Sequence, residues 1–480
     1  MNLQLILKNA SFLFVGNVMV RMLTAISAIV IARYLGAEQY GILSIALVFS
    51  TFASSMTDLG LTHTFIREGT KADKDISKLL NSYLVTRLFI CIFSSVIVFI
   101  LVNFMYSQKE MKQVIFLMVI PTIFGAALQN VGAVYYQIIE KMKYTAIIRI
   151  MAGLISVIGL LIGVYFGYSL LMVALTYGLC SILGGIISIS FVINKIKLHK
   201  GLDNSILNGL SAFTLTAFLT ILMPLMGPIA LEKVSSLEQV GYFNAALRIP
   251  SVLYQIPGIV AAAFYPVLFK LIDRSELKKH GEVIVIEIKL MTLLSVIMVL
   301  PIILFPEEIS VFLLGENWIG IAETLSILSI IVFIQSINFP LADSLTTKGL
   351  QKYRSIALLI SFGTGIFAYS YFGKLYGSLG AAIAAVLIEI VLLLGLIIFN
   401  KQGIFTVFRG SSKSLLSLIF LYVINKLFLG NINIFISLVI SYLIVLIVIL
   451  SEKDLIKKYD SKKRNLLCRG GYKCLFLRYL

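Results

Sequence analysis

Glu38-Gln39-Tyr40-Gly41 is repeated as Glu238-Gln239-Val240-Gly241 about 200 residues later, and each copy lies between two long apolar runs. Two further short motifs also recur, in the same order and at nearly the same offset. They are Lys143-Tyr144 with Lys352-Tyr353, and Ser169-Leu170 with Ser378-Leu379. The shared order and spacing indicate a chain built from two similar halves of about six spans each, an architecture common among membrane transporters.

The composition is that of an integral membrane protein. Of the 480 residues, 59% are hydrophobic and 13% are charged, whereas a soluble protein carries about 25% charged residues. A helix needs roughly 20 apolar residues to cross the bilayer, and the runs lack strand alternation, so we expect helices. Fourteen candidate spans follow: 11–32, 41–60, 83–106, 114–136, 145–167, 171–193, 210–231, 241–264, 286–305, 324–344, 356–374, 379–400, 414–429 and 434–450.

The basic residues predict the orientation of these spans. Most of the 40 Lys and Arg residues fall in the connections on one side and in the tail, which the positive-inside rule places in the cytoplasm together with both termini. The net charge of +17 is thus explained by topology and by contact with anionic lipid headgroups rather than by nucleic acid. The predicted outer connections hold few basic residues: Arg33, Lys109, Lys112, Lys233, Lys374 and Lys426.

Cysteine and histidine give no sign of catalytic or metal chemistry. The four cysteines are scattered, and Cys468 and Cys474 lack the spacing of zinc ligands. His63, His199 and His280 lie far apart in the sequence. We therefore expect no metal site, no cofactor and no enzymatic activity.

Arginines within the spans are the strongest candidates for function. Arg21 lies near the middle of the first span, too far from either end for its side chain to reach the headgroups. Such a charge either pairs with a buried acid or faces a water-filled cavity, where it can bind an anionic substrate. Arg87, Arg149 and Arg248 lie one or two turns inside their spans. The guanidinium group suits a phosphate, because it donates two parallel hydrogen bonds and stays charged.

Two acids allow either a structural or a functional interpretation. Asp58 ends the second span within conceivable reach of Arg87, so it either pairs with that arginine or couples transport to a cation. Glu389 lies in the middle of the twelfth span, where it is either a satisfied buried acid or a proton site. The sequence leaves open whether a proton or a sodium gradient is used.

Several motifs resemble those of Wzx-type polysaccharide flippases, which belong to the MOP superfamily with multidrug (MATE) exporters and lipid II flippases. The resemblance extends in order over about residues 5–400. The motifs are Arg33-Tyr34-Leu35-Gly36-Ala37-Glu38-Gln39-Tyr40-Gly41, Asp58-Leu59-Gly60-Leu61, Val240-Gly241-Tyr242-Phe243-Asn244, Phe312-Leu313-Leu314-Gly315-Glu316-Asn317-Trp318 and Tyr376-Gly377-Ser378-Leu379-Gly380.

The resemblance implies two six-helix lobes, residues 1–200 and 201–405, related by a pseudo-two-fold axis around a cationic cavity. Two further helices would lie within 406–450, followed by a basic cytoplasmic tail at 451–480. It also implies a bacterial inner-membrane flippase that moves undecaprenyl-diphosphate-linked oligosaccharides to the periplasmic leaflet for O-antigen, capsule or other surface polysaccharide. A polysaccharide polymerase and a chain-length regulator would be its partners.

Three alternatives remain open. A lipid II flippase shares the chemistry of the lipid diphosphate. A MATE-like exporter of cationic drugs shares the architecture but should have an acidic or apolar cavity. A membrane glycosyltransferase would need catalytic acids in a large outer loop, and the predicted outer connections are short.

Overall fold

The protein is all-α throughout the residues described by this computed structural model, which confirms the predicted fold class. The structure describes residues 3–58, 60–69, 74–139, 141–193, 201, 203–207, 222–223, 225–400, 402–429 and 433–452. Its helices are α1 (Leu3–Met56), α2 (Leu61–Gly69), α3 (Ile76–Met105), α4 (Lys109–Ile138), α5 (Met142–Tyr165), α6 (Leu170–Ile193), η1 (Asn204–Leu207), α8 (Leu237–Leu253), α9 (Gln255–Asp273), α10 (Leu277–Leu304), α11 (Pro306–Leu314), η2 (Glu316–Ile321), α12 (Ala322–Thr347), α13 (Gln351–Phe399), α14 (Gly403–Ile424), η3 (Asn425–Leu429) and α15 (Ile434–Ser451).

Ten of the described helices are long and apolar enough to cross a membrane. Two of them, α1 and α13, each hold two predicted spans on either side of a non-helical glycine. Gly36 has φ +75° and Gly377 has φ +57°, conformations that a residue without a Cβ adopts at little cost. The number of spans, 14, stays a prediction because part of span 210–231 and most of the 451–480 tail lie outside the described residues.

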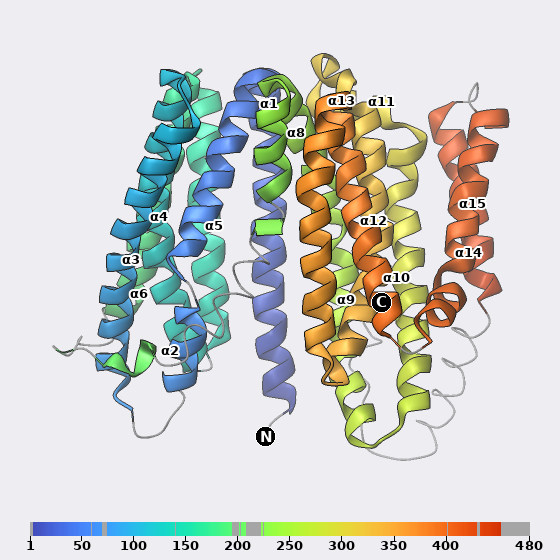
Figure 1. Cartoon of the computed structure of the whole chain (residues 1–480), viewed down its shortest axis with the longest axis horizontal. Helices are drawn as coiled ribbons and strands as arrows, with labels where there is room; N and C mark the ends of the chain where they lie inside the picture. Colours follow the sequence, from blue (N-terminus) through green and yellow to red (C-terminus); the bar gives the residue numbers. More distant parts are fainter. Residues whose placement is uncertain are drawn as a thin grey trace.

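The helices pack as two groups side by side (Figure 1). We call α1–α6 the N-terminal helix group and α8–α13 the C-terminal helix group. Helix α1 packs against α4 and α5 of its own group and also against α8, which is the main contact between the groups. The lobe boundaries predicted above remain predictions.

The two copies of the repeated motif, residues 38–41 and 238–241, meet each other at this contact, near the upper end of Figure 1. A Cβ added to Gly41 would lie 2.0 Å from the Leu237 carbonyl oxygen, and one added to Gly241 would lie 2.0 Å from the Ala37 carbonyl oxygen. The contact is therefore reciprocal, as a two-fold relation between the halves requires. Only glycine at both positions lets the two backbones approach this closely.

One aromatic residue of the first copy and one that follows the second copy pack against Trp318, which is 2% exposed. Tyr40 of the first copy lies edge-on to Trp318 at 6.0 Å between ring centroids, and Tyr242, just after the second copy, lies at 5.8 Å. Gln239 of the second copy accepts a hydrogen bond from the Ser378 backbone N–H at 2.8 Å, beside the Gly377 kink. The two copies of the repeated motif thus form the contact between the two helix groups at this end of the molecule.

The predicted span 241–264 is divided between α8 and α9 at Tyr254. Pro257 lacks the N–H that would bond to the Leu253 carbonyl, so the helical ladder is interrupted there. This break turns Tyr254 towards the space between the two groups.

Helices α14 and α15 lie at the right edge of Figure 1, beside α10. Lys289 of α10 and Glu452, just after α15, form a buried ion pair of 2.6 Å. Lys413 of α14 contacts the other Glu452 oxygen at 3.2 Å. These contacts attach the two C-terminal helices to the C-terminal helix group.

Candidate functional site

A cavity of about 630 Å³ lies between the two helix groups. It is lined by both halves of α1, by α8, α12 and α13, and by Met223, Leu225 and Pro228. Its walls are largely apolar side chains, and three of the described residues that line it are charged: Arg21, Arg248 and Glu389. We call this space the central cavity.

Arg21 reaches the central cavity from the first half of α1, one turn before Thr24 and Ala25, which also line it. The Arg21 side chain is exposed. Of the two predicted roles, the structure therefore places Arg21 at a cavity. Mid-helix charges in membrane proteins generally face such spaces.

Arg248 reaches the same cavity from α8. Tyr254, at the break between α8 and α9, lies within electrostatic range of Arg21, Arg248 and Glu389. Arg21 and Arg248 thus reach one cavity from opposite helix groups, and Tyr254 lines the same cavity.

Glu389 of α13 is held by amide side chains from α12. Gln335 Nε2 donates to Glu389 Oε1 at 2.8 Å, and Asn338 Nδ2 donates to Glu389 Oε2 at 2.9 Å. The carboxylate thus has a hydrogen-bond donor on each oxygen, which stabilises it in its half-buried position. Its predicted role as a proton site stays a prediction.

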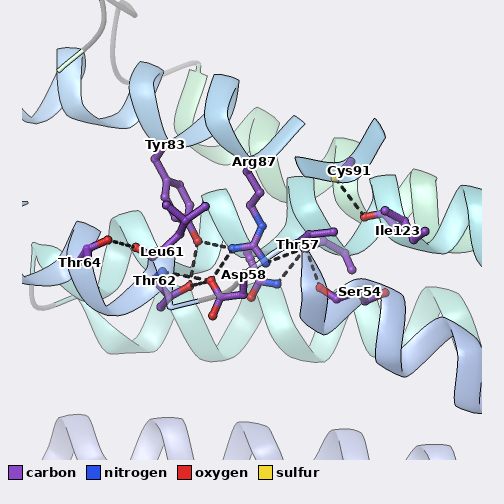
Figure 2. Close-up of polar contacts among 12 residues, drawn as sticks. Ser54, Thr57, Asp58, Leu61, Thr62, Thr64, Tyr83, Arg87, Cys91 and Ile123 are labelled. Carbon is purple, nitrogen blue, oxygen red and sulfur yellow. Dashed lines mark hydrogen bonds and ion pairs between the residues drawn. The ribbon is translucent and has the colours of Figure 1, made fainter. Parts of the chain in front are cut away.

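Arg87 and Asp58 are joined in the structure by an ion pair, one of the two interpretations of Asp58 (Figure 2). Arg87 Nη1 donates to Asp58 Oδ1 at 3.1 Å and also to the Tyr83 hydroxyl, and Arg87 Nη2 donates to Thr57 Oγ1 at 3.3 Å. The Arg87 side chain is 1% exposed. These bonds fix the end of α1 against α3 inside the N-terminal helix group.

Arg149 of α5 lines neither the central cavity nor the polar pocket described below. Tyr254, Gln335 and Asn338 were not among the site residues predicted from the sequence. Gln335 and Asn338 could have been noticed as two amides one turn apart within an apolar span. Tyr254 carried no comparable signal, because it resembles any interfacial tyrosine until the helix break is known.

A helical membrane protein whose charged cavity lies between two repeated helix groups has the architecture of a transporter. Comparison with known proteins leads to the same class. Residues 6–272, more than half of the chain, match the model of the family described as polysaccharide biosynthesis protein. The chain belongs to this family.

Solved structures with the same fold are transporters and flippases. A lipid II flippase MurJ in an inward closed conformation has a TM-score of 0.74 at 18% identity, over 92% of this chain and 99% of that one. An inward-facing MATE multidrug transporter of the MOP superfamily has a TM-score of 0.66 at 14% identity, over 82% and 96%. A MOP superfamily transporter from Pyrococcus furiosus with a binding pocket of reverse polarity has a TM-score of 0.53 at 13% identity, over 86% and 96%.

No curated protein matches the chain. The family match confirms that the chain belongs to a polysaccharide biosynthesis family, as predicted, and the fold is the one shared by the MurJ and MATE structures. The ten long apolar helices are those of a multi-pass membrane protein.

Proposed function

We propose that the protein is a flippase for undecaprenyl-diphosphate-linked oligosaccharides, which it moves from the cytoplasmic to the periplasmic leaflet for O-antigen or another surface polysaccharide. The observation that carries the proposal is the placement of Arg21 and Arg248 on one cavity between the two helix groups. The family supports a role in polysaccharide biosynthesis.

The chemistry of the cavity suits a lipid diphosphate. A diphosphate stripped of water in hydrocarbon is strongly destabilised. Two guanidinium groups can replace its hydration with charge-assisted hydrogen bonds. The apolar walls of the central cavity accept the adjoining lipid, and rocking of one helix group against the other would expose the cavity to each side in turn.

The remaining charged residues have separate proposed roles. Glu389 lies on the central cavity and is a candidate for coupling to protons or sodium, and Asp58 is a second candidate for cation coupling. Substrate contacts by Arg87 and Arg149 also stay predictions. Arg87 already donates to Asp58, Tyr83 and Thr57, so its contribution to anion binding would require those bonds to rearrange.

We further propose a location in the bacterial inner membrane with both termini in the cytoplasm, supported by the distribution of Lys and Arg. A polysaccharide polymerase and a chain-length regulator are the expected partners, because the translocated repeat unit must next be polymerised.

Deletion of the protein tests the proposal. We expect loss of surface polysaccharide and accumulation of lipid-linked repeat units, because their transfer to the outer leaflet is blocked. Wild type should restore the polysaccharide, and the double variant Arg21→Ala/Arg248→Ala should not. Arg409→Ala, which removes an exposed arginine of α14, is the matched control and should restore it. Normal surface polysaccharide with the double variant would contradict the proposal.

A lipid II flippase is the second candidate, because the MurJ structure shares the fold over nearly its whole length. Rescue of a strain depleted of lipid II flippase would favour that function. Cationic drug export is disfavoured, because two arginines on the central cavity repel a cation.

A further inference from the structure

A second cavity lies within the N-terminal helix group. Its volume is about 430 Å³, within the range of roughly 300–1,000 Å³ typical of small-molecule sites. Most of its lining residues are polar, in contrast to those of the central cavity. They include the hydroxyls of Ser50, Ser54, Ser156 and Ser181 and the amides of Gln129 and Asn130. We call this space the polar pocket.

Part of this wall has unused hydrogen-bonding capacity. Ser50 is 2% exposed, and its hydroxyl has no hydrogen-bond partner among the described residues; the same holds for the Ser54 hydroxyl. Asn130 donates one hydrogen bond to the Ala126 carbonyl at 3.0 Å, and its amide has a second N–H and a carbonyl oxygen to offer. Buried groups of this kind usually acquire a partner, which points to a polar ligand.

Asp58 supplies an acceptor on the same wall. Every hydrogen bond that the described residues make to its carboxylate, from Thr62 and Arg87, ends on Oδ1. The side chain is still 34% exposed and lines the polar pocket. Oδ1 is thus anchored (Figure 2), while Oδ2 accepts no hydrogen bond from the residues that the structure describes.

The charges of the polar pocket favour a neutral ligand. Asp58 and Arg87 are its charged lining residues in the described part of the chain, and they neutralise each other. An anion would meet the open Asp58 oxygen, and a cation would meet the arginine. Hydroxyl groups both donate and accept, so they match serine, amide and carboxylate groups together.

The polar pocket adjoins the central cavity. Leu47, Thr51 and Ser55 line both spaces. Tyr177 lines the polar pocket and interacts electrostatically with Arg248 of the central cavity. One elongated molecule can therefore occupy both spaces, with an anionic part near Arg248 and a neutral polar part beyond Tyr177.

We infer that the polar pocket binds neutral, hydroxyl-bearing sugar residues of the lipid-linked substrate while the diphosphate binds at Arg21 and Arg248. This inference rests on the proposed function and adds the site of sugar recognition to it. It assigns selectivity for the glycan to α4, α5 and α6 and to the second half of α1, whereas Arg21 and Arg248 recognise the part common to all such lipids.

Binding of two probes to the purified full-length protein tests the inference. The probes are undecaprenyl diphosphate and the lipid-linked repeat unit isolated from bacteria that lack the protein. We expect wild type to bind the repeat unit about tenfold more tightly, as a few additional hydrogen bonds would provide. Gln129→Leu/Asn130→Leu should lose this preference and keep its affinity for undecaprenyl diphosphate.

Two further variants make the result specific. Gln113→Leu removes an exposed amide from the same helix and should keep the preference. Asn130→Ala changes the volume less than the double substitution and should weaken the preference, so a folding defect in the double variant does not decide the outcome. If wild type binds both probes equally, or Asn130→Ala and the double variant keep the full preference, the sugar site is wrong while the proposed function stands. Failure to bind either probe would contradict the proposed function itself.

Discussion

Arg87 and Arg21 illustrate two ways in which an arginine is stabilised within the bilayer. Arg87 is paired with Asp58 and surrounded by Tyr83 and Thr57. Arg21 faces the central cavity, which Tyr254 and Glu389 also line. The ion pair of Arg87 stabilises the N-terminal helix group, whereas the charge of Arg21, which faces a cavity, is available to a ligand.

Asp58→Ala should destabilise the N-terminal helix group, because the buried Arg87 guanidinium would lose its carboxylate. The expected loss is roughly 2–4 kcal/mol, below that for a fully buried pair because Asp58 is one third exposed. Thermal unfolding in detergent, compared with wild type, measures it. Asp58→Asn keeps an acceptor for Thr62 and should lose less. Equal stability of Asp58→Ala and wild type would show that the ion pair contributes little.

At this scale the sequence showed which charged residues lie within spans, but not what surrounds them. The mid-span position of Arg21 predicted a cavity or a buried partner, and the reach between Asp58 and Arg87 predicted their possible pairing. The amides that hold Glu389 and the serines of the polar pocket were missed. Isolated Ser, Asn and Gln residues are common in membrane helices, and only the packing of α1 against α4 and α6 brings them to one space.

At the scale of the elements, the close crossing of α1 and α8 depends on two glycines. Gly41→Val should force the helices apart, because its Cβ would lie 2.0 Å from the Leu237 carbonyl oxygen. We expect roughly 1–3 kcal/mol of destabilisation from this overpacking.

The single tryptophan of the chain, Trp318, reports on the crossing directly. It is buried against Tyr40 and Tyr242, so separation of the helices in Gly41→Val should shift its fluorescence to longer wavelength and increase quenching by acrylamide. Gly363→Val is the control, because a Cβ there meets nothing within 4 Å. Unchanged Trp318 fluorescence in Gly41→Val would contradict the described crossing.

Glu452→Ala should loosen the attachment of α14 and α15 to α10. Lys289 and Glu452 are both buried, and removal of one partner of a buried ion pair costs roughly 3 kcal/mol or more. Thermal unfolding should therefore begin at a lower temperature. Lys413→Ala, which removes the 52% exposed partner, should have an effect of about 0–1 kcal/mol. Similar effects of the two substitutions would contradict the assigned roles.

The apolar runs predicted the helices well but not their interruptions. Spans 11–32 and 41–60 belong to one helix, α1, with a kink at Gly36, because glycine can reverse the chain without a loop. Span 241–264 becomes α8 and α9 because Pro257 breaks the ladder. Hydropathy averages over about 20 residues and does not register a single kinked residue.

At the scale of the whole molecule, the repeat seen in the sequence becomes a physical contact between the two helix groups. Gly41 and Gly241 lie against each other. The spacing of the repeated motifs suggested that the two halves are related, but only the packing of the helices shows that the motifs are in contact. The size and lining of the central cavity could not be predicted, because they depend on side chains from five separate segments.

Translocation in proteoliposomes tests the central claim most directly. The protein would be reconstituted with the lipid-linked repeat unit from the deletion strain, and the fraction of glycan accessible from outside would be followed over time. We predict rapid exchange with wild type and a loss of roughly tenfold or more for each of Arg21→Ala and Arg248→Ala, as expected for the removal of charge-assisted hydrogen bonds. Exchange at the wild-type rate in the double variant, with normal reconstitution, would contradict the account.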